Sequence, residues 1–179
     1  PGGLRVPVYP TSIKGFGSFA GPAFHSTHWD HTASYAGKRV AVIGSAASAV
    51  QLIPEVAQTA AHVDVYQRTA NWVIPRYQFS YPAIIKWIFR HVPGALRLHR
   101  ILMFAAVDAR IAGFRKDSLA NWLVRLESTA FLRHVIKDPE LRRALTPTIP
   151  PGCKRILVSD DFYPSLARPN VSLITSGIS

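Results

Sequence analysis

The 179-residue chain has one cysteine, one methionine and few acidic residues. The lone thiol, Cys153, excludes an internal disulfide framework and fits a reducing compartment, so we predict a cytoplasmic location. No signal-peptide pattern is visible in the sequence. Only 10 Asp and Glu oppose 21 Lys and Arg, which gives a formal net charge of +11. Such a charge requires that nucleic-acid binding be considered.

The basic residues do not form a nucleic-acid-binding motif. The sequence contains no tight basic tract, zinc-ligand spacing, RNA-binding motif or basic zipper. The arginines are instead spread along predicted helices: Arg90, Arg97, Arg100, Arg110, Arg115, Arg125, Arg133, Arg142 and Arg143. Anionic cofactors would favour such a positive charge. We therefore expect no nucleic-acid partner.

Long uncharged hydrophobic runs are also absent. Residues 81–115 are rich in aromatic and aliphatic side chains, but basic residues and histidines interrupt them, including Lys86, Arg90, Arg97 and Arg100. No uncharged run reaches the roughly 18 residues needed to span a bilayer. We predict an amphipathic helix pair packed on the rest of the protein. Peripheral contact with an anionic membrane is the less favoured alternative.

What the chain does contain is a strand–glycine–helix unit. Val40 to Ile43 form a continuous apolar run, typical of a parallel strand covered on both faces. Gly44 permits a tight turn, and small residues follow it: Ser45, Ala46, Ala47, Ser48 and Ala49. A helix that begins near Ala46 and includes Gln51 would direct its free N–H groups at a phosphate. A second strand over 62–66 would complete a βαβ crossover.

The dinucleotide-binding pattern in this unit is imperfect. The glycines of G-x-G-x-x-G correspond to Gly44, Ala46 and Ala49. Alanine is small enough for the third position, but at the second position its methyl group stands where the backbone approaches the pyrophosphate. The unit predicts dinucleotide binding, and an α/β crossover without a ligand is the alternative.

The end of the second strand favours NADP over NAD. NAD-binding domains usually place an acidic residue about 20 residues past the glycines, on the ribose. Asp64 is near that position but lies inside the predicted strand. Arg68 offers a planar charged fork suited to a 2′-phosphate, with the Thr69 hydroxyl beside it. The alternative is a solvated arginine at a strand end.

Helical patterns continue from 117 to 145. One apolar stripe comprises Leu119, Trp122, Leu123 and Leu126. Asp138, Pro139 and Glu140 form a typical helix start, with an N-cap acid and proline in the first turn. A last strand is predicted over 171–175.

Three separated motifs occur in a fixed order. The first, F-x-G-x-x-x-H-x-x-x-W, comprises Phe19, Gly21, His25 and Trp29. The second is V-Y-Q-R-T-A-N-W-V-I-P-R over 65–76, and the third combines P-G-C-K-R, S-D-D-F-Y-P and R-P-N-V over 151–171. Together they resemble Baeyer–Villiger monooxygenases, which are class B flavin monooxygenases. N- and S-oxygenating relatives usually carry Tyr in place of Trp29.

The resemblance implies an α/β fold: a Rossmann-like NADP-binding domain with a parallel sheet, a helical insertion and partial edges of an FAD domain. It divides the chain into a linker and fingerprint segment (1–36), the Rossmann core (37–76), the helical insertion (77–146) and a return toward the FAD domain (147–179). The chain is then expected to be an interior fragment, with FAD bound mainly by parts outside it.

The resemblance also implies roles for single residues. Lys154 would join Arg68 on the NADP 2′-phosphate, and Arg155 would be the catalytic residue, a fixed cation beside the negative charge that develops at the flavin. Two solvated basic residues in a Pro/Gly-rich loop are the alternative. His25 and Trp29 would have structural and gating roles. No cysteine or acidic ligand set accompanies the nearby histidines, so no metal is expected.

The activity implied by the resemblance uses both cofactors. NADPH reduces FAD, and the reduced flavin captures O₂ as a C4a-peroxide that converts a ketone to an ester or lactone. One alternative is an N- or S-oxygenating monooxygenase. Another is a non-catalytic NADP-binding module, if the chain is complete as given. The chain alone is expected to be inactive because it cannot hold FAD.

Overall fold

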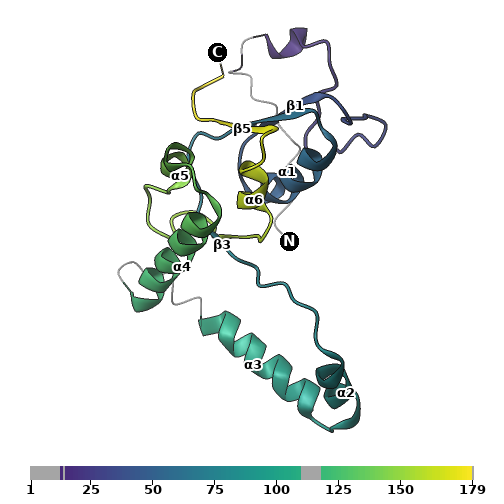
Figure 1. The fold of residues 1–179 in the computed structure, drawn as a ribbon, viewed down its shortest axis with the longest axis vertical. Helices are drawn as coiled ribbons and strands as arrows, with labels where there is room; N and C mark the ends of the chain where they lie inside the picture. Colours follow the sequence, from purple (N-terminus) through teal and green to yellow (C-terminus); the bar gives the residue numbers. More distant parts are fainter. Residues whose placement is uncertain (1–12, 14, 110–117, 179) are drawn as a thin grey trace. The chain divides into compact units, whose positions relative to one another are not determined.

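The computed structural model describes residue 13 and residues 15–109 and 118–178. The start of the predicted linker, the end of the predicted helix pair and Asp117 lie outside the described residues. The chain divides into two compact units, and each is described by itself (Figure 1). Unit one comprises Pro1–Arg68 with Arg168–Ser179, and unit two comprises Thr69–Ala167.

Unit one contains a three-stranded parallel sheet. Its strands are β1 (Arg39–Ile43), β2 (His62–Tyr66) and β5 (Val171–Ile174), in the order β1-β2-β5. The central strand, β2, buries Val63 and Val65 completely. The predicted strands are confirmed, as is the α/β class with a parallel sheet.

Helix α1 (Ala47–Thr59) connects β1 to β2 in unit one. Its buried residues recur at helical spacing: Val50, Ile53, Val56 and Ala57. Pro54 lies inside the helix, which nevertheless continues to Thr59. A short 3-10 helix, η1 (Phe16–Ser18), precedes the sheet.

Asp64 is a buried acid in the middle of β2. The Arg39 Nε–H donates to Asp64 Oδ2 at 2.6 Å, and His62 Nε2 lies 3.4 Å from Asp64 Oδ1. The hydrogen bond from the Arg39 guanidinium, with its charge, holds the pKa of the Asp64 carboxyl below its ordinary value. Asp64 is therefore a structural partner of β1, consistent with its predicted place inside the strand.

Unit two is built around a short parallel pair, β3 (Val73–Ile74) and β4 (Leu157–Val158). Three helices contribute buried side chains to its core: α4 (Leu119–Val135), α5 (Pro139–Leu145) and α6 (Phe162–Leu166). The largest fully buried side chains of this unit are those of Tyr163, Phe162, Ile136, Leu145 and Val73. Asp138 caps α5 and Pro139 begins it, as predicted.

The buried face of α4 differs from its apolar stripe. Leu119, Trp122, Leu123 and Leu126 are each at least 50 % exposed, whereas Asn121 and Ser128 are buried. Asn121 Nδ2 donates to the Pro151 carbonyl at 3.0 Å, and Ser128 Oγ donates to the Val73 carbonyl at 2.8 Å. These bonds satisfy the buried polar groups. The covered face therefore joins these two polar side chains to the buried apolar residues Val124 and Leu132, and it excludes the predicted stripe.

Two helices of unit two, α2 (Ala83–His91) and α3 (Ala95–Ala109), form a hairpin. Gly94 adopts φ 81 in the turn between them. The Tyr81 hydroxyl lies 2.8 Å from His99 Nε2, which links the segment before α2 to α3. The predicted helix pair is confirmed over these residues, whereas its packing on the rest of the protein stays a prediction. In the part of the chain that is described, no helix combines the length and apolar character needed to cross a membrane.

The Arg39–Asp64 pair predicts a pH-dependent contribution to stability. Arg39→Ala should lower the free energy of unfolding at neutral pH, because it leaves the buried Asp64 carboxylate without the guanidinium that donates to it. The folded pKa of Asp64 is lowered, so this contribution is complete above the unfolded value of about 3.9 and lost as the pH falls through the folded value.

Urea unfolding of the wild type and the variant across this pH range measures the effect. The difference in unfolding free energy should be constant from about pH 5 to 7 and shrink below about pH 4. Lys38→Ala, which removes the neighbouring exposed cation, is the control. A difference that grows on acidification would contradict the assignment.

Candidate functional site

The turn after β1 has the backbone conformation that a glycine supplies. Gly44 adopts φ 103, and no described atom lies within 4 Å of where its Cβ would be. Its N–H donates to the Tyr66 carbonyl at 2.8 Å, which ties the turn to the end of β2. The backbone at this turn is therefore open on the side where a side chain would stand.

Helix α1 begins directly after this turn. Ala46 is its N-cap, and no side chain in the described part of the chain caps this end. Ser45 is buried, whereas Ser48 and Gln51 are exposed and Ala47 and Ala49 are half-buried. The first-turn N–H groups and the positive end of the helix dipole can therefore receive an anion.

Arg68 lies at the same edge of the sheet as the Gly44 turn. It follows Gln67, a buried residue whose N–H donates to the Ile174 carbonyl at 2.8 Å and so extends the pairing of β2 with β5. The carboxyl ends of parallel strands meet at one edge of a sheet, where ligands of such folds bind. The guanidinium of Arg68 is exposed.

In unit two, Lys154 Nζ donates a hydrogen bond to Thr69 Oγ1 across 85 positions of the chain. The segment that carries Lys154 is not extended: it turns at Pro151 and Gly152, where Gly152 adopts φ 95, and bends through Lys154. Proline followed by glycine favours such a turn. Arg155 comes directly after the bend and is exposed.

Two side chains hold the segments on either side of β3 and β4. Trp72, which is buried, donates from Nε1 to the Ile149 carbonyl at 2.7 Å. The Asp160 carboxylate accepts from the backbone N–H groups of Arg76 at 2.7 Å, Tyr77 at 3.2 Å and Gln78 at 3.2 Å. Tyr77 has a φ of 54. The sequence offers no signal for this contact of Asp160 beyond its place in the S-D-D-F-Y-P motif, two residues after β4.

The fingerprint residues of unit one make local contacts. A Cβ on Gly21 would stand 2.7 Å from the ring of Phe19, so that ring lies directly over the glycine. The Trp29 ring meets the rings of Phe24 and Tyr35 edge to face, with centroids 4.9 and 6.2 Å apart. These contacts fit a structural part for the segment.

His25 is engaged with its own turn. The Thr27 backbone N–H donates to His25 Nδ1 at 3.2 Å, and Thr27 Oγ1 lies 2.8 Å from the same nitrogen. Nδ1 therefore acts as an acceptor, which leaves the proton of a neutral imidazole on Nε2. Within residues 15–109 and 118–178, no group of three or more His, Cys, Asp and Glu side chains is placed to hold a metal ion.

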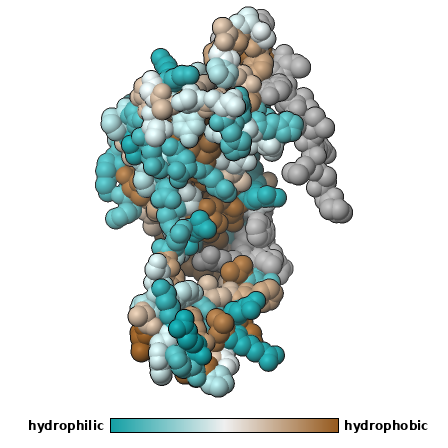
Figure 2. All heavy atoms as spheres, turned by 90° about the vertical axis from the view of Figure 1, so that its right-hand side faces the viewer, coloured by the Kyte–Doolittle hydropathy of each residue, from teal (hydrophilic) through white to brown (hydrophobic). Residues whose placement is uncertain are grey.

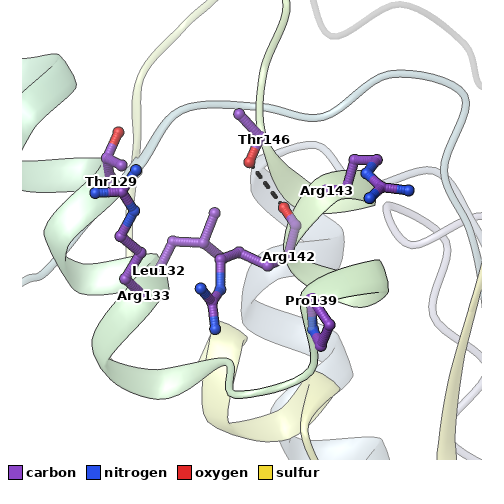
Figure 3. Close-up of a pocket in the computed structure, with 7 residues that line it drawn as sticks. All are labelled: Thr129, Leu132, Arg133, Pro139, Arg142, Arg143 and Thr146. Atoms are coloured by element: carbon purple, nitrogen blue, oxygen red, sulfur yellow. Dashed lines mark hydrogen bonds between the residues drawn. The ribbon is translucent and has the colours of Figure 1, made fainter.

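A cavity of about 220 Å³ lies between α4 and α5 of unit two, and its lining includes none of the predicted site residues (Figure 3). Three arginines border it, but Figure 3 shows the guanidinium groups of Arg133 and Arg143 on opposite sides. Arg142 donates to the carbonyls of Ile136 and Lys137 at the end of α4. The three guanidinium groups do not converge on one ligand position.

The model of the flavin-binding monooxygenase-like family matches residues 3–103 of this sequence. A "Baeyer-Villiger monooxygenase" of Pseudomonas aeruginosa is 42% identical over 99% of this chain, and one of Streptomyces coelicolor is 38% identical over 99%. The chain therefore belongs to the flavin-binding monooxygenase-like family, and the resemblance seen in three motifs is confirmed.

Solved structures share the fold. A chain titled "Oxidized steroid monooxygenase bound to NADP" matches 93% of this chain with a TM-score of 0.72 at 24% identity. A structure of OTEMO in complex with FAD and NADP matches 96% with a TM-score of 0.70 at 28% identity. This chain spans only part of the length of the proteins that it matches. It covers 33% of the Pseudomonas relative and 34% of the Streptomyces relative. It covers 38% of the steroid monooxygenase chain and 40% of the OTEMO chain.

The three hydrogen bonds that the Asp160 carboxylate accepts predict which backbone amides are protected from hydrogen exchange. Asp160→Ala removes the common acceptor of three N–H groups, so amide hydrogen exchange at Arg76, Tyr77 and Gln78 should accelerate at least about tenfold. Hydrogen exchange followed by NMR measures each amide. Asp161→Ala is the matched control, because that neighbouring side chain does not cap α6. Equal acceleration of exchange in both variants would show a general loosening of the segment and would contradict the assigned hydrogen bonds of Asp160.

Proposed function

We propose that this chain is the NADP-binding part of an NADPH- and FAD-dependent monooxygenase of the Baeyer–Villiger type. The reaction inserts one oxygen atom of O₂ into a ketone and gives an ester or lactone. The observation that carries the proposal is the 42% identity to a Baeyer–Villiger monooxygenase over 99% of the chain. We place the protein in the cytoplasm, because its one cysteine fits a reducing compartment.

The Gly44 turn and the start of α1 would bind the pyrophosphate of NADP. The open backbone at Gly44 and the uncapped first turn of the helix supply N–H donors and a positive dipole, as an anion requires. Residues from Ser45 to Ala49 are small enough not to obstruct it, and Gln51 is exposed one turn further along. Ala46 still carries a methyl group where the usual pattern has glycine, so the fit here is closer than in a strict G-x-G-x-x-G turn.

Arg68 would bind the 2′-phosphate that distinguishes NADP from NAD. Its guanidinium is exposed at the sheet edge where ligands of parallel sheets bind, and no acidic residue stands at the end of β2. Asp64, the one nearby acid, is occupied by Arg39. Lys154 and Thr69 share a hydrogen bond, and we assign both to the same phosphate.

Arg155 would stabilise negative charge during oxygen transfer. FAD, held mainly by segments outside this chain, supplies the redox chemistry that activates O₂ when it is bound. A guanidinium fixed beside the position where negative charge develops stabilises that charge most strongly where water is excluded, and we assign this role to Arg155.

The fingerprint residues would couple the position of the cofactor to the movement of the domains. They are Phe19, Gly21, His25 and Trp29.

An N- or S-oxygenating reaction is the second candidate, since it differs only in the atom that is oxidised. Trp29 in place of the usual Tyr favours ketone oxidation. Offering a cyclic ketone and a tertiary amine to the full-length protein, and identifying the products, distinguishes the two reactions. Neither product, together with retained NADP binding, would instead support a non-catalytic NADP-binding module.

Arg68→Ala tests the cofactor assignment on this chain. Loss of a charge-assisted contact with the 2′-phosphate should weaken NADPH binding at least about tenfold and leave NADH binding nearly unchanged. Equilibrium dialysis with each nucleotide measures both constants. Arg125→Ala, at an exposed arginine of α4, controls for the loss of one positive charge. Equal losses for NADPH and NADH would refute the role of Arg68.

Arg155→Ala tests the catalytic assignment in the full-length protein. We expect NADPH binding within about twofold of wild type and ketone oxygenation lowered at least about a hundredfold, the usual effect of removing a charge stabiliser. Single-turnover assays separate oxygenation from cofactor reduction. Arg155→Lys should recover part of the rate, because it restores the charge without the planar fork. Full oxygenation by Arg155→Ala would remove Arg155 from the mechanism.

A further inference from the structure

The α2–α3 hairpin exposes an apolar surface. Both helices lack buried side chains, and seven of their large apolar residues are each at least 54% exposed: Ile84, Trp87, Leu98, Ile101, Leu102, Phe104 and Val107. The lower part of the space-filling view, where Figure 1 places this hairpin, shows hydrophobic and hydrophilic surface side by side (Figure 2). So many exposed large apolar side chains on two neighbouring helices indicate an interaction site.

The same hairpin is basic. Lys86, Arg90, Arg97 and Arg100 lie on the two helices, and the sequence has no acidic residue between Asp64 and Asp108. Arg97 and Arg100 border an open hollow of about 590 Å³, together with Gly94, Leu96, Ile101 and Phe104. Cationic and apolar groups therefore share one surface.

We propose that the α2–α3 hairpin docks on an anionic lipid surface. A bilayer offers acyl chains for the apolar side chains and phosphate headgroups for the cations, at the depths that an amphipathic helix uses. Trp87, 54% exposed and stacked on His91, is the residue type that favours the headgroup region. The excess of cations over acids selects anionic over neutral lipid. This proposal replaces the packing of the helix pair on the rest of the protein, which the sequence favoured, and it is independent of the proposed oxygenase activity.

Co-sedimentation with lipid vesicles tests the docking. The 179-residue chain should bind vesicles of phosphatidylcholine containing a quarter phosphatidylglycerol, and bind pure phosphatidylcholine vesicles at least about tenfold less tightly. High salt should weaken the binding because it screens the charges. Ile101→Ser with Phe104→Ser should abolish it by removing the apolar part of the contact. Absence of binding to anionic vesicles would overturn the proposal.

A pair of matched charge variants separates docking from the attraction of any cation to an anionic surface. Arg97→Glu with Arg100→Glu should weaken binding at least about tenfold. Arg125→Glu with Arg133→Glu alters the net charge equally, but on α4, and should change binding less than about threefold. Circular dichroism checks that each variant folds. Equal losses in the two variants would overturn the assignment to the hairpin.

Tryptophan quenching by brominated lipid gives a readout that does not depend on charge variants. Trp87 and Trp122 are matched in exposure, 54% and 55%, but only Trp87 lies on the hairpin. Trp87→Phe should remove most of the quenching and Trp122→Phe little of it. The reverse result would place the contact on α4 and overturn the proposal. Concentration-dependent self-association without lipid that shields Trp87 would also overturn it, in favour of a second copy.

Discussion

The in-register parallel pairing of β1 and β2 is the constraint on which unit one depends. Ile43 stands opposite Tyr66, so the two strands end at the same level, and the Gly44 N–H then continues the pairing to the Tyr66 carbonyl. This places the glycine turn and Arg68 at one edge of the sheet. A one-residue slip would turn β2 over and move Asp64 away from Arg39. The charged pair and the candidate cofactor site thus share one register.

Unit two depends on polar anchors more than on strand pairing. Each of its strands has only two residues, too few for a stable sheet by themselves. Ser128 and Asn121 instead bind α4 to the carbonyls of Val73 and Pro151, and Asp160 holds the backbone beyond β3. Buried bonds of this kind specify one arrangement, because leaving a single partner unsatisfied is expensive.

Local patterns in the sequence predicted β1, α1, β2 and the start of α5. Hydrophobic periodicity, runs of small residues and helix caps depend only on residues a few positions apart, so they can be recognised in the sequence. The covered face of α4 could not be predicted this way. The buried side chains of Asn121 and Ser128 donate hydrogen bonds to carbonyls that lie 30 and 55 positions away in the chain. Helical spacing does not encode contacts over such separations. No sequence pattern predicted the hydrogen bond of Lys154 to Thr69, although the strand end placed the Thr69 hydroxyl beside the 2′-phosphate and the family resemblance placed Lys154 there. The contribution of Asp160 depends on a backbone turn that sequence alone does not specify.

The anchors of unit two have an evolutionary consequence. The Asp160 carboxylate holds the chain at Gln78, before the hairpin, and the bond of Asn121 to the Pro151 carbonyl holds it again after the hairpin. The two ends of the intervening segment are therefore held in place by contacts with residues outside it. Doubling the length of such a loop adds only about 0.6 kcal/mol of closure entropy. The stretch between Gln78 and Asn121 is therefore an insertion point, where relatives can gain, lose or exchange helices while the surrounding core keeps its bonds.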